Sequence, residues 1–197
     1  MRFVRNLLVA GMLCTGLLHG AASSAAVINL NLAGAVQIGA SFPVEVWVSE
    51  MFTGLPSDED LLAFGMRVSN SSPELFSFTG SSIQPPFDDD STLVGLDAAG
   101  SAFPGIAQRS ASQSVWLASL TFNALAAGNG TLGVRSDLND PNQGLIFFQS
   151  APVSLEADLS VSIVPVPLPA ALWLMLGGMS LLAGIARRRM HSGAVGW

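Results

Sequence analysis

The middle of the chain alternates apolar and polar residues with a period of two, and this pattern limits the possible folds most. In the stretch PVEVWVSE, Val44, Val46 and Val48 fall on one face and Glu45 on the other. Side chains of a β-strand point alternately to the two faces of a sheet, so each such run predicts a half-buried strand. Runs of this kind, bounded by turn-forming residues, occupy 27–34, 43–50, 61–69, 74–80, 114–125, 130–136, 144–150 and 153–164. Many short strands separated by turns are typical of an all-β sandwich or barrel.

The predicted strand at 114–123 departs from simple alternation. Leu117 and Phe122 differ in parity, so we expect a bulge or a twist near residues 118–119. We expect Trp47 and Trp116 to be core or half-buried residues. The alternative is an aromatic platform for a sugar.

Charge and composition exclude several functions for residues 27–164. This stretch has three arginines against fourteen acidic residues, a net charge of −11, which excludes a nucleic-acid-binding surface. His19, His191 and Cys14 all lie outside it, and the chain has no lysine or tyrosine. Ser-His-Asp, Cys-His and His/Cys zinc sites are therefore excluded there. Paired carboxylates could serve a glycosidase, but no motif marks such a pair, so we expect a protein that is not an enzyme.

Residues 1–26 have the parts of a secretory signal peptide. Arg2 and Arg5 form the charged start, 7–18 is an apolar run, and small residues follow up to Ala26. An uncleaved anchor is the alternative, but the apolar run is too short to span a bilayer. We expect cleavage after Ala26, which leaves 27–164 as the main domain.

The C-terminal end also has distinct parts. Prolines alternate over 165–169, which predicts an extended segment that cannot pair as a central strand. Residues 170–186 carry no charge and reach the lower length limit of a transmembrane helix. The basic cluster Arg187, Arg188 and Arg189 follows, and a short tail, 190–197, ends the chain. Because positive charge marks the cytoplasmic side, we expect the bulk of the chain on the other side of the membrane.

The sequence VPLPAALWLMLGGMSLLAGIARRR, 166–189, resembles the PEP-CTERM sorting signal of Gram-negative bacteria that make exopolysaccharide. The motif here is Val166, Pro167, Leu168 and Pro169, with Leu168 where the name-giving form has Glu. The resemblance implies recognition by an exosortase, a membrane-embedded cysteine transpeptidase-like enzyme that cleaves near the motif. This chain would be the substrate of that enzyme.

A second resemblance covers residues 36–164. The stretches VQIGASFPVEVWVSE, LLAFGMRVSNSSPELFSFTG and VWLASLTFNALAAGNGTLGV look like those of a cohesin-like domain. The resemblance implies a jelly-roll β-sandwich, and cohesins bind dockerins through one sheet face. The chain departs from the family at Gly39-Ala40, where an Asp often follows the Gly, and at Ser72-Pro73, where the usual pair is Asp-Pro.

Two acidic loops are candidate calcium sites, because carboxylate oxygens suit Ca²⁺. The first comprises Asp88, Asp89, Asp90 and Asp97; the alternative is a solvated acidic loop. The second spans 137–142 and is equally well explained as a tight turn. The acidic residues at 58–60 most simply begin a single helical turn.

Together these features predict an exported surface or matrix protein without enzymatic activity, associated with exopolysaccharide or biofilm. It would pass through an inner-membrane intermediate before an exosortase releases it to the cell surface or the medium. The alternative is a module that binds a dockerin-like protein or a carbohydrate.

Overall fold

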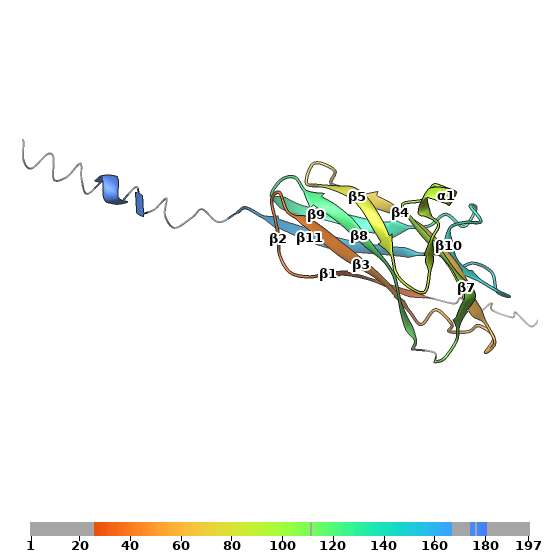
Figure 1. The fold of residues 1–197 in the computed structure, drawn as a ribbon. Helices are drawn as coiled ribbons and strands as arrows, with labels where there is room; N and C mark the ends of the chain where they lie inside the picture. Colours follow the sequence, from red (N-terminus) through yellow and green to blue (C-terminus); the bar gives the residue numbers. More distant parts are fainter. Residues whose placement is uncertain (1–25, 111, 167–173, 176, 181–197) are drawn as a thin grey trace, which may run out of the picture.

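A computed structural model describes residues 26–110, 112–166, 174–175 and 177–180, and it confirms the all-β sandwich (Figure 1). One sheet has four strands in the order β1-β3-β8-β5: Val27–Leu32, Ser41–Ser49, Ser114–Ala124 and Phe76–Ile83. The other has the order β2-β11-β9-β4-β7-β6, with β10 paired to β4. Its strands are β2 (Val36–Gln37), β4 (Asp60–Asn70), β6 (Asp88–Asp89), β7 (Ala98–Ala107), β9 (Gly128–Arg135), β10 (Gly144–Phe147) and β11 (Glu156–Val164). A single helical turn, α1 (Ser91–Val94), follows β6.

The core lies between the two sheets and consists of the apolar positions of the alternating strands. Val44, Val46 and Val48 are fully buried, as their pattern predicts. The ring of Phe122 stacks on Phe42, with 5.6 Å between ring centroids. Among the described residues, every strand of the two sheets and every buried residue of this core lies within 27–164.

Two strands depart from regular alternation. In β8 the bulge expected from the sequence is present: Val46 pairs with Ala118 and Trp47 with Trp116, which leaves Leu117 as the extra residue. Leu117 therefore faces the core together with Phe122. In β4 the alternation predicts that Leu62 faces the core, but Leu61 is fully buried instead. The β4–β7 register shifts between Leu61 and Ala63, which reverses the parity at this point.

Each of the eight predicted runs contains a strand, but the sequence does not reveal β2, β6 or β7. The longest of these, β7, reads AAGSAFPGIA and has no alternation to recognise. Residues 57–58 form a turn, not a helical turn.

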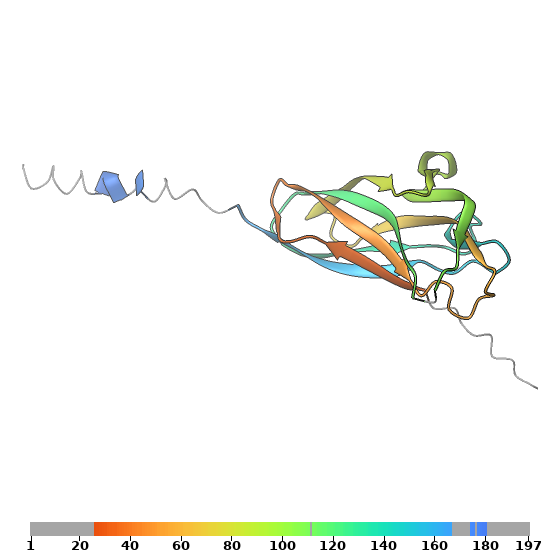
Figure 2. The ribbon, with the colours of Figure 1, turned by 60° about the horizontal axis from the view of Figure 1, so that its bottom comes forward.

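The chain enters and leaves the sandwich at opposite ends (Figures 1 and 2). Val27 at the start of β1 pairs with Ser49, which pairs with Ser114 at the start of β8; we call this the entry end. At the other end β11 finishes at Val164 beside Gln37; we call this the exit end. The eleven residues of β8 separate the two ends by about 30 Å.

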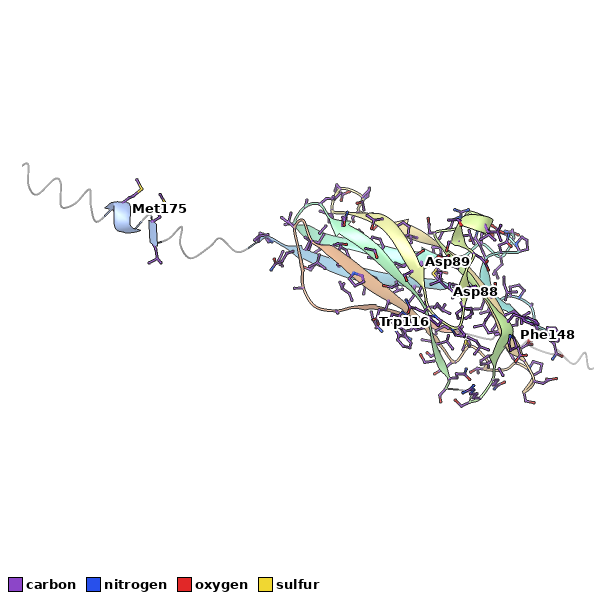
Figure 3. All side chains as sticks on the ribbon, in the orientation of Figure 1. Asp88, Asp89, Trp116, Phe148 and Met175 are labelled. Atoms are coloured by element: carbon purple, nitrogen blue, oxygen red, sulfur yellow. The ribbon has the colours of Figure 1, made fainter. Side chains whose placement is uncertain are left out.

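The flanking segments lie largely outside the described residues. Ala26 packs against the core, and Val166 is exposed. Residues 1–25, Pro167, Leu168, Pro169 and the basic cluster at 187–189 are not described. Residues 174–175 and 177–180 are helical and exposed, and Met175 is labelled in Figure 3. In the part of the chain that the structure describes, no helix has the length and apolar character needed to cross a membrane.

Candidate functional site

A cleft of about 710 Å³ opens at the entry end, a size typical of ligand-binding pockets. We call it the entry cleft. It lies between the end of β7 and the start of β8, and its lining comprises residues 85–86, 103–107, 109 and 113–116. Most of this lining is apolar, because it contains three prolines, Phe103, Ile106 and Trp116.

The first residues of β8 form one wall of the cleft, because the pairing of β5 with β8 ends before it reaches them. The β5–β8 ladder ends where Ile83 faces Ala118, and the last backbone bond beyond it runs from the Gln84 N–H to the Leu117 carbonyl, 3.0 Å. Pro85 and Pro86 come next, and proline has no N–H to donate, so the ladder cannot continue. The first residues of β8 therefore border the cleft in place of a neighbouring strand.

The opposite wall is a bulge in β7. Leu61 pairs with Ile106 and Ala63 with Ser101, so four residues of β7 stand opposite Leu62 alone. Gly105 allows this bulge to lie close to β4, because a Cβ there would come within 2.8 Å of the Leu62 side chain. Phe103, at the outer part of the bulge, is 100% exposed.

Trp116, which is labelled in Figure 3, lines the cleft and also contacts a second tryptophan. The indole rings of Trp47 and Trp116 are stacked, with 5.4 Å between centroids and 10° between planes. Both residues are half-buried, as expected, and both lie on the outer face of the four-stranded sheet. Because each ring covers one face of the other, the pair offers no continuous two-ring platform for a sugar. Trp116 lines the cleft and Trp47 does not.

The polar groups of the cleft gather at one side. Gln113 accepts a hydrogen bond from the Arg109 N–H at its Oε1 atom, 2.8 Å, which holds the two residues together. Ser114 lies next to them and is exposed. Arg109 is the charged member of the lining, and none of the described lining residues is acidic. The domain as a whole has a net charge of −11, and Asp60 lies just outside the lining as the strand partner of Ala107.

A buried carboxylate holds the loops beside the cleft together. Glu59 is fully buried and accepts hydrogen bonds from the Ser150 hydroxyl at 2.5 Å and the Gln149 N–H at 2.8 Å. Its own carbonyl accepts from the Gln108 N–H, 3.3 Å. Burial raises the pKa of Glu59, but the hydrogen bonds from Ser150, Gln149 and Asp60 outweigh burial and hold the pKa below the ordinary value. The sequence placed Glu59 in a polar turn and gave no sign of this role.

The structure does not gather the first calcium candidates into a site. Asp88 and Asp89 are exposed on β6, whereas Asp90 accepts a hydrogen bond from the Ser101 hydroxyl at 2.5 Å. Asp97 accepts one from the Val68 N–H at 2.7 Å. Among the described residues, no three acidic, histidine or cysteine side chains are grouped so that they could hold a metal ion.

The second acidic loop has the contacts of a tight turn. Asp137 accepts hydrogen bonds from the backbone and side-chain N–H groups of Asn139, at 2.9 and 2.7 Å. Asp140 accepts from the Asn142 N–H at 3.0 Å and from the Gln143 side chain at 3.0 Å. The bonds from Gln143 and Asn142 lower the pKa of Asp140. These carboxylates organise their own loop, which favours the turn over the calcium site.

No protein-family model and no curated protein matches this chain. Among solved structures, it is similar to a cohesin module of a family 33 glycoside hydrolase from Clostridium perfringens, at 10% identity and a TM-score of 0.49, over 73% of this chain and 99% of the module. It is similar to the sixth cohesin of Acetivibrio cellulolyticus scaffoldin B, solved with a Cel5 dockerin, at 12% identity and a TM-score of 0.39, over 70% and 99%. Domains 4 and 5 of the S-layer protein SbsC show 13% identity and a TM-score of 0.27, over 71% and 54%. At these scores, a ligand has to be argued from the residues of this chain.

Proposed function

We propose that this chain is an exported, non-enzymatic binding module that docks a protein partner at the entry cleft. One observation carries the proposal: Phe103 is completely exposed at the rim of a cleft that Trp116 and three prolines make apolar. Exposed aromatic side chains beside a preformed cleft are the usual anchors of protein interfaces. A solvated Phe at this position has no role in the packing of the domain itself.

The sorting segment is consistent with this use. We propose that the signal peptide, 1–26, exports the chain, and that an exosortase recognises 166–169 while the apolar helix holds the chain in the inner membrane. The chain leaves the sandwich at the exit end, and the cleft lies at the entry end. An anchored molecule would therefore present the cleft away from the membrane.

Partner capture with two matched variants tests the binding proposal. Residues 27–166, with Phe103→Ser and with the control Leu93→Ser, are immobilised and exposed to the extracellular fraction of the native host. Leu93 is also apolar and 82% exposed, but it lies on α1, outside the cleft. We expect a bound protein whose affinity falls at least about tenfold with Phe103→Ser and stays unchanged with Leu93→Ser. Equal retention by both variants would refute binding at the cleft.

The intact mass of the protein in membrane and extracellular fractions tests the sorting proposal. Loss of residues 1–26 and of the segment beyond about 166–169 is expected in the extracellular form. A single form that retains 170–197 and stays in the membrane would show a permanent anchor instead.

A glycan is the second candidate ligand. Trp116 has Gln113 and Ser114 beside it, and a sugar needs such an aromatic ring with adjacent hydrogen-bonding groups. Tryptophan fluorescence during titration with the exopolysaccharide of the host tests this candidate, with Trp116→Ala as the variant that should abolish the response.

A further inference from the structure

The first residues of β8 form a free strand edge inside the entry cleft. On one side, β3 pairs with β8 along its whole length, from Ser49↔Ser114 to Ser41↔Asn123. On the other side, the β5 ladder reaches only Ala118. Among the described residues, no strand pairs with Ser114–Trp116 on that side. A strand edge of this kind is a template for another extended chain.

The surroundings of this edge limit what can be added to it. Pro85 and Pro86 border the cleft where β5 leaves β8, so an added segment must stop there and pair with only a few residues. Phe103 and Ile106 form the far wall, which favours apolar side chains on the added segment. A short extended peptide fits this arrangement better than a helix does, because strand addition uses backbone bonds along one edge.

Charge favours an acidic group on the added segment. Arg109 is the charged residue of the lining, and the described part of the cleft contributes no carboxylate to pair with it. Neither ion pair found in the described residues uses Arg109, since both belong to Arg135. The Arg109 guanidinium can form a bidentate pair with a carboxylate of the partner.

We infer that the partner protein contributes a short extended segment, apolar with one acidic side chain, which adds to β8 along Ser114–Trp116 and sets its carboxylate against Arg109. This inference rests on the proposed function, because it specifies how the partner occupies the entry cleft. Strand addition makes a distinctive demand on the partner: alternate backbone N–H groups point toward β8 and the others point away.

A selected peptide tests the inference. Residues 27–166 are used to select binders from a random ten-residue display library, with the Phe103→Ser variant as the counter-selection. The best peptide is then synthesised with single N-methyl groups at each position, and affinities are measured by calorimetry. We expect N-methylation to weaken binding at least about tenfold at the one or two positions whose N–H groups face Ser114–Trp116, and to have little effect at the neighbouring positions. We also expect the peptide to contain one acidic residue. Replacing this residue by its amide should weaken binding to the wild-type domain but not to the Arg109→Gln variant.

Three outcomes would overturn the inference. The first is a selection that yields no peptide dependent on Phe103. The second is tolerance of N-methylation at every position, which would mean docking by side chains alone. The third is binding of host exopolysaccharide, or of a second copy of the fragment, through the cleft, detected by fluorescence or by sedimentation. A partner whose capture depends on Phe103 would still support the proposed function under the first two outcomes, so the two failures can be told apart.

Discussion

Replacing Glu59 tests the claim that one buried carboxylate holds the entry end together. Its side chain accepts three hydrogen bonds, from the Ser150 hydroxyl, the Gln149 N–H and the Asp60 N–H, the last at 3.3 Å. A hydrogen bond to a charged group contributes about 1.5–3 kcal/mol, and donors left unsatisfied cost a similar amount. The three hydrogen bonds share one carboxylate, so their contributions to stability are not additive. We therefore expect Glu59→Ala to lower the free energy of unfolding by about 3–4 kcal/mol. That corresponds to a fall in Tm of roughly 10 °C for a domain of this size.

The dependence on pH separates the charge from the shape of the side chain. The pKa of Glu59 is below the ordinary value of 4.5, so the ionised form is favoured by folding. The stabilisation is complete above pH 4.5 and is lost as the pH falls through the lower pKa of the folded state. Glu59→Gln keeps the shape but not the charge. Its deficit relative to wild type should therefore be largest at neutral pH and shrink in acid.

Urea denaturation at pH 7, 5 and 3.5 measures both effects, with Glu74→Gln as the matched control. Glu74 is exposed and makes none of these contacts, so its variant should match wild type at pH 7. The reasoning fails if Glu59→Gln equals wild type at pH 7, or if its deficit is the same at all three pH values.

Three further substitutions test the packing of the sandwich. Gly65→Ala would place a Cβ 1.9 Å from the Asn142 carbonyl oxygen, so the backbone must shift, and we expect a loss of at least about 2 kcal/mol by urea denaturation. Phe122→Ala removes a fully buried ring from the core and should cost about 3–5 kcal/mol by calorimetry. Arg135→Gln breaks the ion pair with Asp158, 2.7 Å on a partly exposed surface, and should cost at most about 1 kcal/mol, with a smaller effect in 1 M salt.

The period-two pattern was sufficient for the parts of the fold that alternate. It located eight strands and indicated an irregularity near residues 118–119, close to the bulge found at Leu117, because parity within one strand is a local property. It could not reveal β7, whose small residues and proline carry no alternation, although this strand forms a wall of the cleft. It also could not indicate that Trp47 stacks on Trp116, because that contact depends on the register between strands far apart in the sequence.

The candidate site was less predictable than the fold because it forms where the pairing of two strand pairs, β5–β8 and β4–β7, is interrupted. The cleft depends on a ladder that Pro85 and Pro86 end, and on a bulge that Gly105 allows. Each of these residues is an ordinary turn signal in the sequence. Only the pairing of β5 with β8 and of β7 with β4 shows that the two interruptions face each other. The acidic clusters were more conspicuous in sequence, yet Asp137 and Asp140 bond their own loop, and Asp90 and Asp97 bond groups of neighbouring strands.

Signal-peptide cleavage would add a charge to the entry end. Cleavage after Ala26, as predicted, leaves the α-amino group on Val27. Val27 stands in the same cross-strand row as Ser49 and Ser114, about 10 Å from the free edge of β8. The mature protein would then carry two positive groups at this end, the terminal ammonium and Arg109, on a domain whose net charge is strongly negative. Glu50, next to Ser49, and Asp60, paired with Ala107, place carboxylates at the same end, so the added ammonium would offset part of their charge and reduce the repulsion of an acidic segment.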